Sequence, residues 1–111
     1  MPFRAQPVHV AKANLFRVLG HPARVRILEL LRDGERSVGW LQTELDLDSG
    51  GTSQHLSSLR RVGMVESRRE GTTVYYRVGD VRVFDLLSAG RDIISRQLTA
   101  NQSVLRELDR P

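Results

Sequence analysis

The sequence LQTELDLDSGGTSQHLSSLRRVG, which runs from Leu41 to Gly63, decides the fold of this chain. It predicts a short helix, a turn and a second helix with apolar residues on one side and polar residues on the other. This is the layout of a helix-turn-helix, a motif whose second helix enters the major groove of DNA. We therefore expect the flanking segments to build a platform for that second helix.

The second helix, expected at about residues 49–62, divides into two faces when it is rotated by ~100° per residue. Its apolar side carries Leu56 and Leu59. Its polar side suits base reading, because Gln bonds adenine at two positions, Arg bonds guanine and Ser adapts to either; a merely solvated face is the alternative. The candidates for base contacts are Gln54, Ser57, Ser58, Arg61 and Ser53, and those for phosphate contacts from this helix are Ser49, Thr52 and Arg60.

The start of this helix has two interpretations. Asp48 or Ser49 can cap it, since either offers a side-chain oxygen to the free amides of the first turn. Gly50 and Gly51 follow, and each glycine costs a helix about 0.8–1.0 kcal/mol relative to alanine. Either the first turn is loose and becomes ordered on DNA, or a longer loop delays the helix until Thr52.

A β-hairpin is predicted directly after this helix, at about residues 65–78. Val74–Val78 alternates apolar and polar residues as a half-buried strand does, and Gly71 suits the positive φ of a tight turn. A hairpin in this place is a wing that reaches the DNA backbone or the minor groove, and an ordinary edge hairpin is the alternative. The candidate wing contacts are Arg68, Arg69 and Thr72.

Two further helices are expected before the motif. Apolar spacing predicts a first helix at about residues 8–19, and a broad apolar stripe between Pro22 and Gly34 predicts a buried central helix. Ser37 is a candidate N-cap for the short helix that opens the motif. The single tryptophan, Trp40, is interpreted as core or interface filling, with a base-stacking platform as the alternative.

The last third of the chain predicts one long helix, at about residues 80–108. Its apolar residues follow a 3-4 spacing that calls for a partner helix, and a stripe about 36 Å long is difficult for so small a domain to cover. We expect a second subunit to cover it; a helix folded back on its own domain is the alternative. The candidate interface residues are Leu15, Phe84, Leu87, Ile94, Leu98 and Leu105.

Length and composition set limits on the function. We expect the 111 residues to form a single domain, 1–111. From the motifs above, we expect this domain to be mainly α with a small β-hairpin: a winged helix-turn-helix of about five helices and a two-stranded wing. The chain has no cysteine, and neither a membrane-spanning apolar run nor a signal peptide is evident, so we expect a cytoplasmic protein. The net charge of +4 fits a polyanionic partner.

The motifs resemble the ArsR/SmtB family of winged helix-turn-helix repressors. The resemblance covers roughly residues 12–98 and is carried by GHPARVRILELL at 20–31 and TSQHLSSLRRVGMVESRREGTTVYYRV at 52–78. It implies a bacterial homodimer, joined through its first and last helices, that binds a short inverted repeat in a promoter.

The chain departs from the metal-sensing members of that family. They carry a cysteine pair on the helix written here VGWLQTEL, and Asp and His on the last helix, whereas no histidine follows His55 here. His21, which directly precedes Pro22, is interpreted as a capping residue and His55 as structural, and His9 alone does not make a site. We therefore predict no metal and no cofactor, and the effector stays unknown.

These observations predict a DNA-binding transcriptional regulator, a homodimeric repressor that occludes the polymerase from its operator. Phosphate contacts would supply most of the affinity, including a contribution from Arg4. A winged-helix module that binds protein instead of DNA is the alternative. No nucleophile–base pair, phosphate-binding loop or acid cluster is evident, so no enzymatic activity is expected.

Overall fold

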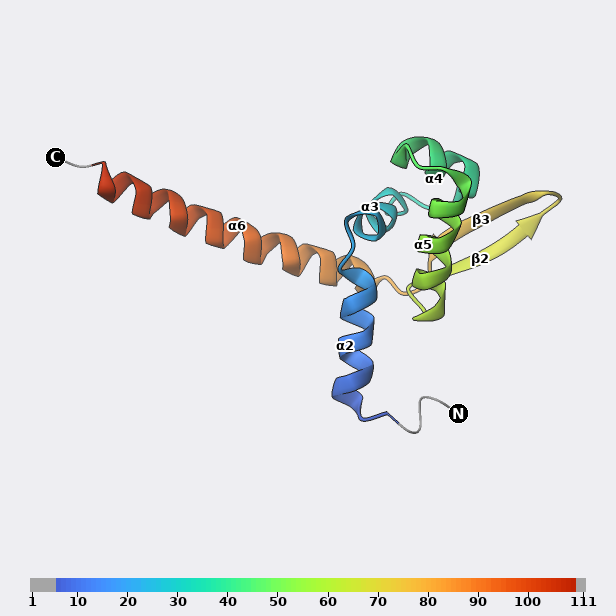
Figure 1. Cartoon of the computed structure of the whole chain (residues 1–111), viewed down its shortest axis with the longest axis horizontal. Coiled ribbons are helices and arrows are strands. Elements are labelled where there is room, and N and C mark those ends of the chain that lie inside the picture. Colours follow the sequence, from blue (N-terminus) through green and yellow to red (C-terminus); the bar gives the residue numbers. More distant parts are fainter. Residues whose placement is uncertain (1–5, 110–111) are drawn as a thin grey trace.

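The computed structural model describes residues 6–109, within which five helices and three strands follow one another along the chain (Figure 1). Three of the helices, α3, α4 and α5, lie together beside the wing, whereas α2 and α6 project from this group in different directions. The elements are α2 (Val8–Leu19), α3 (Pro22–Leu30), β1 (Arg36–Ser37), α4 (Val38–Leu45), α5 (Ser49–Arg61), β2 (Val65–Glu70), β3 (Thr73–Val78) and α6 (Arg82–Leu108).

The starts of α3 and α4 agree with the capping residues that the sequence predicts. Pro22 occupies the first turn of α3, and His21 Nδ1 accepts a hydrogen bond of 3.1 Å from the Ala23 amide. Ser37 Oγ likewise accepts a 3.1 Å bond from the Trp40 amide at the start of α4. Both caps satisfy amides that the first turn of a helix leaves unpaired, and both predictions are confirmed.

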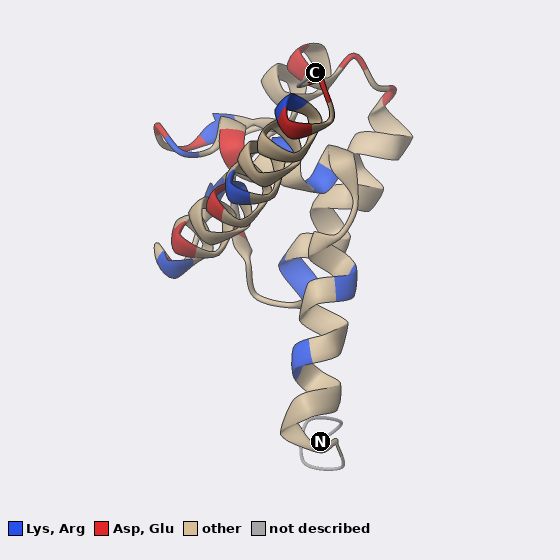
Figure 2. Ribbon diagram, turned by 90° about the vertical axis from the view of Figure 1, so that its left-hand side faces the viewer, with Lys and Arg blue, Asp and Glu red and all other residues tan. Residues whose placement is uncertain are grey.

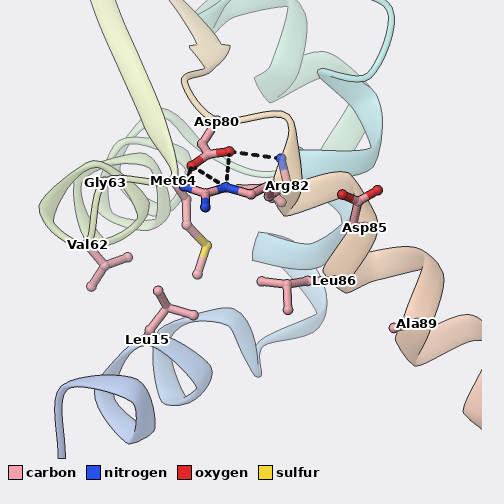
Figure 3. A pocket seen from close by; sticks show the side chains of 10 residues that line it. Leu15, Val62, Gly63, Met64, Asp80, Arg82, Asp85, Leu86 and Ala89 are labelled. Carbon is pink, nitrogen blue, oxygen red and sulfur yellow. Dashed lines mark hydrogen bonds and ion pairs between the residues drawn. The ribbon is translucent and has the colours of Figure 1, made fainter. Parts of the chain in front are cut away.

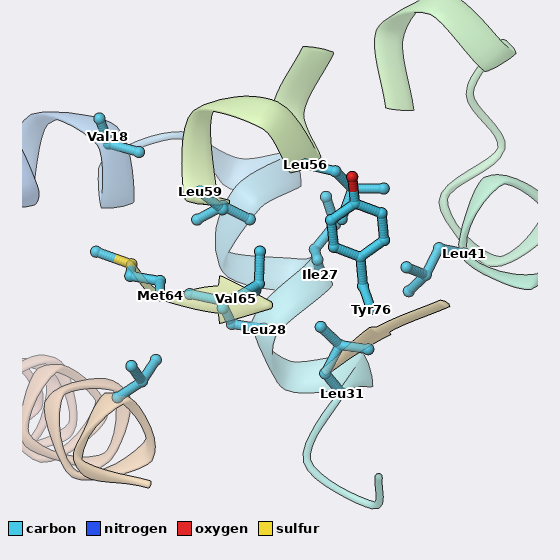
Figure 4. Packing of buried hydrophobic residues seen from close by; sticks show 11 residues of the cluster. Val18, Ile27, Leu28, Leu31, Leu41, Leu56, Leu59, Met64, Val65 and Tyr76 are labelled. Atoms are coloured by element: carbon cyan, nitrogen blue, oxygen red, sulfur yellow. The ribbon is translucent and has the colours of Figure 1, made fainter. Parts of the chain in front are cut away.

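The hydrophobic core lies where α3, α4, α5 and the root of the wing meet (Figure 4). Leu56 and Leu59 from α5 are fully buried in it, as is Ile27 from α3. Tyr76 from β3 and Val65 from β2 close the same cluster from the sheet. The core thus holds α5 through the side that carries Leu56 and Leu59 and leaves its opposite side to solvent.

The sheet has three strands, in the order β1-β3-β2, and not the two that the sequence predicts. The hairpin is confirmed: Glu70 faces Thr73 across a turn in which Gly71 has a φ of 62°. The additional strand is β1, in which Arg36 and Ser37 pair with Tyr76 and Tyr75. Two residues are too few to show a β period, so only the tertiary structure identifies β1 as a strand.

Helix α6 leaves the core after its first turns. Val83 is its only buried residue within the part of the chain that the structure describes, and every residue from 91 to 108 is exposed. The helix gives the molecule its extents of 67 × 39 × 23 Å. The alternative of a tail helix folded on its own domain is therefore wrong. None of the helices in residues 6–109 has the length and apolar character to cross a membrane.

Candidate DNA-binding surface

Helix α5 begins at Ser49 and is capped by Asp48. The Asp48 carboxylate accepts a 2.8 Å hydrogen bond from the Gly51 amide. A Cβ at Gly51 would lie 2.8 Å from that carboxylate oxygen, so the glycine permits the close approach of the cap. Both glycines belong to the first turn, and the interpretation that delays the helix until Thr52 is wrong.

The polar face of α5 is exposed along its length while Leu56 and Leu59 anchor it beneath. Ser53, Gln54, Ser57, Arg60 and Arg61 are exposed, and Ser49 is exposed at the start of the helix. Ser58 is half-buried, so it lies at the edge of this face. The row formed by Gln54, Ser57 and Arg61 presents a side-chain amide, one hydroxyl and a guanidinium, which are groups that read base edges.

Thr52 does not belong to this surface, and its prediction as a phosphate contact is wrong. Its side chain is 0% exposed, and its hydroxyl donates a 2.9 Å hydrogen bond to the Asp48 carbonyl oxygen. The hydroxyl of Thr52 therefore finds its hydrogen-bond partner in the backbone of α5 and does not face solvent. Thr52 shares its side of the helix with Leu56 and Leu59, as the helical rotation predicts.

A polar cluster holds α5 against the helices before it. Arg24 on α3 donates from Nε to His55 Nδ1 at 3.1 Å and from Nη1 to the Val18 carbonyl at 3.2 Å. The rings of His21 and His55 lie 4.4 Å apart. Burial, then the neighbouring His21 and Arg24, lowers the pKa of His55. Neutral His55 therefore has the structural role that the sequence predicts.

In the wing, Arg68 is held by the protein itself. Its guanidinium contacts Glu35 at 2.6 Å and Glu70 at 3.2 Å, and lies 4.6 Å above the ring of Tyr75. These carboxylates raise the pKa of Arg68, and the hydrogen bond from Arg68 lowers the pKa of Glu35. The two acidic partners therefore offset the charge of the Arg68 guanidinium.

Arg69, the neighbour of Arg68 in β2, is exposed and forms no ion pair within residues 6–109. It pairs across the hairpin with Val74, and the alternation of β2 places it on the same face as Val65, the face that packs toward α5. Thr72 is exposed beside the turn. The sequence could not distinguish Arg68 from Arg69, because Glu35 lies 33 residues before Arg68.

The charges are unevenly distributed over the elements (Figure 2). Helices α2 and α5 carry Lys and Arg without Asp or Glu, whereas α6 and the wing mix both signs. Arg4, a further predicted contact, lies outside the described residues. The polar face of α5 and the basic residues near it thus form the surface that best suits a polyanion.

The predicted dimer residues separate into two groups. Ile94, Leu98 and Leu105 are exposed on α6, and Leu15 and Leu87 are half-buried at the edge of the core. Phe84 belongs with the second group, because it too is half-buried, with the Arg32 guanidinium 5.5 Å from its ring. The structure adds Phe16, which is 52% exposed and lines an apolar groove with Leu87, Ile94 and Leu98.

Two other features of the sequence have clear positions. Trp40 is half-buried against the core, with the Arg36 guanidinium 4.5 Å above its ring, which fits core filling. Within residues 6–109, no group of three or more His, Asp or Glu side chains could hold a metal ion.

Comparison with known proteins identifies the family. Residues 21–67 match the model of the bacterial regulatory proteins of the arsR family. Rv0081 of Mycobacterium tuberculosis, an uncharacterized HTH-type transcriptional regulator, is 40% identical over 105 residues, which cover 94% of this chain and 92% of that protein. The crystal structure of Rv0081 gives a TM-score of 0.80 over 87% of this chain and 98% of that chain.

Two further relatives agree with this assignment. The biofilm growth-associated repressor of Xylella fastidiosa is 36% identical over 77 residues, covering 69% of this chain and 68% of that protein. The homodimeric winged helix-turn-helix DNA-binding domain of Mb0332 from Mycobacterium bovis is 30% identical, with a TM-score of 0.74 over 85% of this chain and 92% of that one. The chain therefore belongs to the arsR family, as a winged helix-turn-helix DNA-binding transcriptional regulator and not an enzyme.

Proposed function

We propose that this protein is a homodimeric repressor that binds an inverted-repeat operator in double-stranded DNA and blocks the polymerase there. The observation that carries the proposal is the exposed row of Gln54, Ser57 and Arg61 on a helix whose Leu56 and Leu59 are fully buried. A rigid helix with a polar reading face is the arrangement that a major groove accepts. Its site of action would be the cytoplasm, where bacterial promoters lie.

Each contact has a proposed role. Gln54, Ser57 and Arg61 read base edges, with Ser53 and Ser58 at the sides of the row. Ser49, Arg60, Arg69 and Thr72 contact phosphates, and Arg68 instead holds the wing to Glu35. We assign Arg69 the main wing contact because it is the exposed arginine of the pair that has no acidic partner within residues 6–109.

Dimerisation supports this function, since two copies of α5 can read two half-sites that lie one helical turn apart. The exposed apolar residues of α6 and Phe16 of α2 provide the proposed interface. The homodimeric Mb0332 domain and the repressor of Xylella fastidiosa are consistent with a dimer and with repression.

The proposal is tested with genomic fragments selected by this protein, measured against random DNA over a salt series. Gln54→Ala should cost about 1–3 kcal/mol on the selected operator and little on random DNA, because it removes a base contact. Arg69→Ala should weaken binding to both and reduce the slope of log K against log salt by about 1.

Two controls sharpen this experiment. Arg106→Ala removes an exposed cation near the end of α6 and should leave operator binding unchanged. Arg68→Gln should leave the salt slope unchanged, since the charge of Arg68 is already paired. Equal losses on operator and random DNA for Gln54→Ala would show that α5 does not read bases, and a wild-type salt slope near zero would contradict DNA binding by this surface.

A further inference from the structure

A hollow of about 530 Å³ lies between α2, the end of α5 and the start of α6 (Figure 3). Leu15 from α2, Val62 and Met64 from the turn after α5, and Leu86 from α6 point into it. Its volume is within the range of about 300–1,000 Å³ that small-molecule sites occupy. Apolar walls of this kind suit a ligand with a hydrocarbon or aromatic body.

The rim of the hollow carries three charged residues, Asp80, Arg82 and Asp85. Arg82 forms an ion pair with Asp80: Arg82 Nη2 lies 2.6 Å from Asp80 Oδ2, and Arg82 Nε lies 3.0 Å from Asp80 Oδ1. The hydrogen bonds from Arg82 lower the pKa of Asp80 to about 2, so this carboxylate stays ionised. Asp85 lines the same rim and has no ion pair within residues 6–109. Two carboxylates and one guanidinium leave the rim with a net charge of −1.

We propose that this hollow binds a small organic cation, an apolar body that carries an amine, with the amine at Asp85 and the body between Leu15, Val62 and Leu86. An anionic ligand is disfavoured because the one cation of the rim is already paired. A second hollow of about 240 Å³ shares Leu15 and Val62 and runs along α2. Because Lys12 also lines this second hollow, only an uncharged extension of the ligand would enter it, and the amine stays at Asp85.

Resting on the proposed function, the same site would also regulate DNA binding. Val62 to Met64 end the DNA-reading helix, where Gly63 has a φ of 81° and the Met64 amide bonds the Leu59 carbonyl at 3.0 Å. Leu15 and Leu86 belong to the helices that carry the proposed dimer interface. A ligand between them changes DNA affinity to the extent that it binds the free and DNA-bound conformations with different affinities.

The test is a fluorescence titration of the full-length protein at neutral pH with 2-naphthylmethylamine, and with 2-naphthoate as its anionic counterpart. The amine should bind saturably and about tenfold more tightly than the acid, because one is attracted and the other repelled by the rim. Asp85→Asn should weaken amine binding about three- to fivefold, as for an exposed charge pair. Asp92→Asn, on an exposed acid farther along α6, is the matched control and should change nothing.

Several results would overturn the site. They are the absence of saturable amine binding by the wild type, equal affinity for amine and acid, and an Asp85→Asn variant that binds as the wild type does. A second variant, Ala89→Trp, fills the hollow and should abolish amine binding; retention would place the probe elsewhere. Because the titration needs no DNA, it distinguishes this site from the proposed function: amine binding without any effect on operator affinity would overturn only the regulatory coupling.

Discussion

Helix α5 and the second half of α6 carry apolar side chains at the same helical spacing but in opposite environments. Leu56 and Leu59 of α5 are 0% exposed, whereas Ile94 and Leu98 of α6 are 59% and 57% exposed. An apolar stripe of this kind marks the side of a helix that is expected to be buried against another element. The difference is that α3, α4 and β2 cover α5 within the protomer, while α6 projects beyond its own domain (Figure 1). An apolar stripe therefore predicts that a face is covered, and the topology decides by what.

The largest expected effect comes from breaking the covered stripe. Leu56→Ala should lower the free energy of unfolding by about 2–5 kcal/mol, because it removes fully buried methyl groups and leaves a cavity under the reading face. Denaturant unfolding at fixed protein concentration measures this loss. Leu98→Ala, made on the exposed stripe, is the matched variant. An equal loss from the two variants at low protein concentration would contradict the difference in burial.

The uncovered stripe is tested through the dimer. Leu98→Asp places a charge on the exposed apolar face, and it should raise the dimer dissociation constant about 100-fold while the far-ultraviolet circular dichroism of the protein is unchanged. Sedimentation over a concentration series measures the change. Thr99→Asp is the control, because Thr99 lies on the polar side of α6. Unchanged self-association of Leu98→Asp would show that this stripe has another partner.

A smaller effect is expected at the start of α5. Asp48→Ala should cost about 0.5–2 kcal/mol of stability, since it leaves the Gly51 amide without its cap. Asp48→Asn keeps a side-chain oxygen at that position and should retain most of the stability. Thermal unfolding of the three proteins checks the order. If Asp48→Ala were as stable as the wild type, the cap of α5 would contribute nothing to the free energy of unfolding.

The smallest effect concerns His55, the polar contact between α5 and α3. Its pKa is lowered in the folded protein, so the unfolded chain binds more protons and acid favours unfolding. Its contribution should be complete above the unfolded pKa of about 6.5 and be lost as the pH falls below that value. Wild-type stability should therefore decrease more than that of His55→Gln between pH 7 and pH 5. His9→Gln, on an exposed residue of α2, should follow the wild type.

Local signals predicted much of the fold and part of the site. Each of these features depends on residues that lie within one or two helical turns of one another, so a short stretch of sequence is enough to predict it. They are the caps at His21 and Ser37, the turn at Gly71 and the buried side of α5. The polar row of Gln54, Ser57 and Arg61 follows from the same rotation. Thr52 shows the limit of residue type as a guide: a threonine suits a phosphate contact, but its hydroxyl bonds the backbone inside the core.

The contacts that the sequence did not predict join distant segments. Glu35 forms an ion pair with Arg68, 33 residues later in the chain, and none with Arg69. Arg24 donates a hydrogen bond to His55, 31 residues later. The strand β1 is likewise too short to have a period of its own. No local pattern records such pairings, since they exist only after the chain has folded.

By itself, the sequence determined the order of the elements, the reading face of α5, the wing and an apolar stripe on α6 that needs a cover. These features depend on backbone propensities and on the periods of helix and strand, which operate over neighbouring residues. The tertiary structure alone decided that Arg68 pairs with Glu35 while Arg69 has no acidic partner within residues 6–109, that Phe84 lies beside Arg32, and that a hollow with an acidic rim lies between α2, α5 and α6. These features depend on which side chains from distant parts of the chain meet after folding.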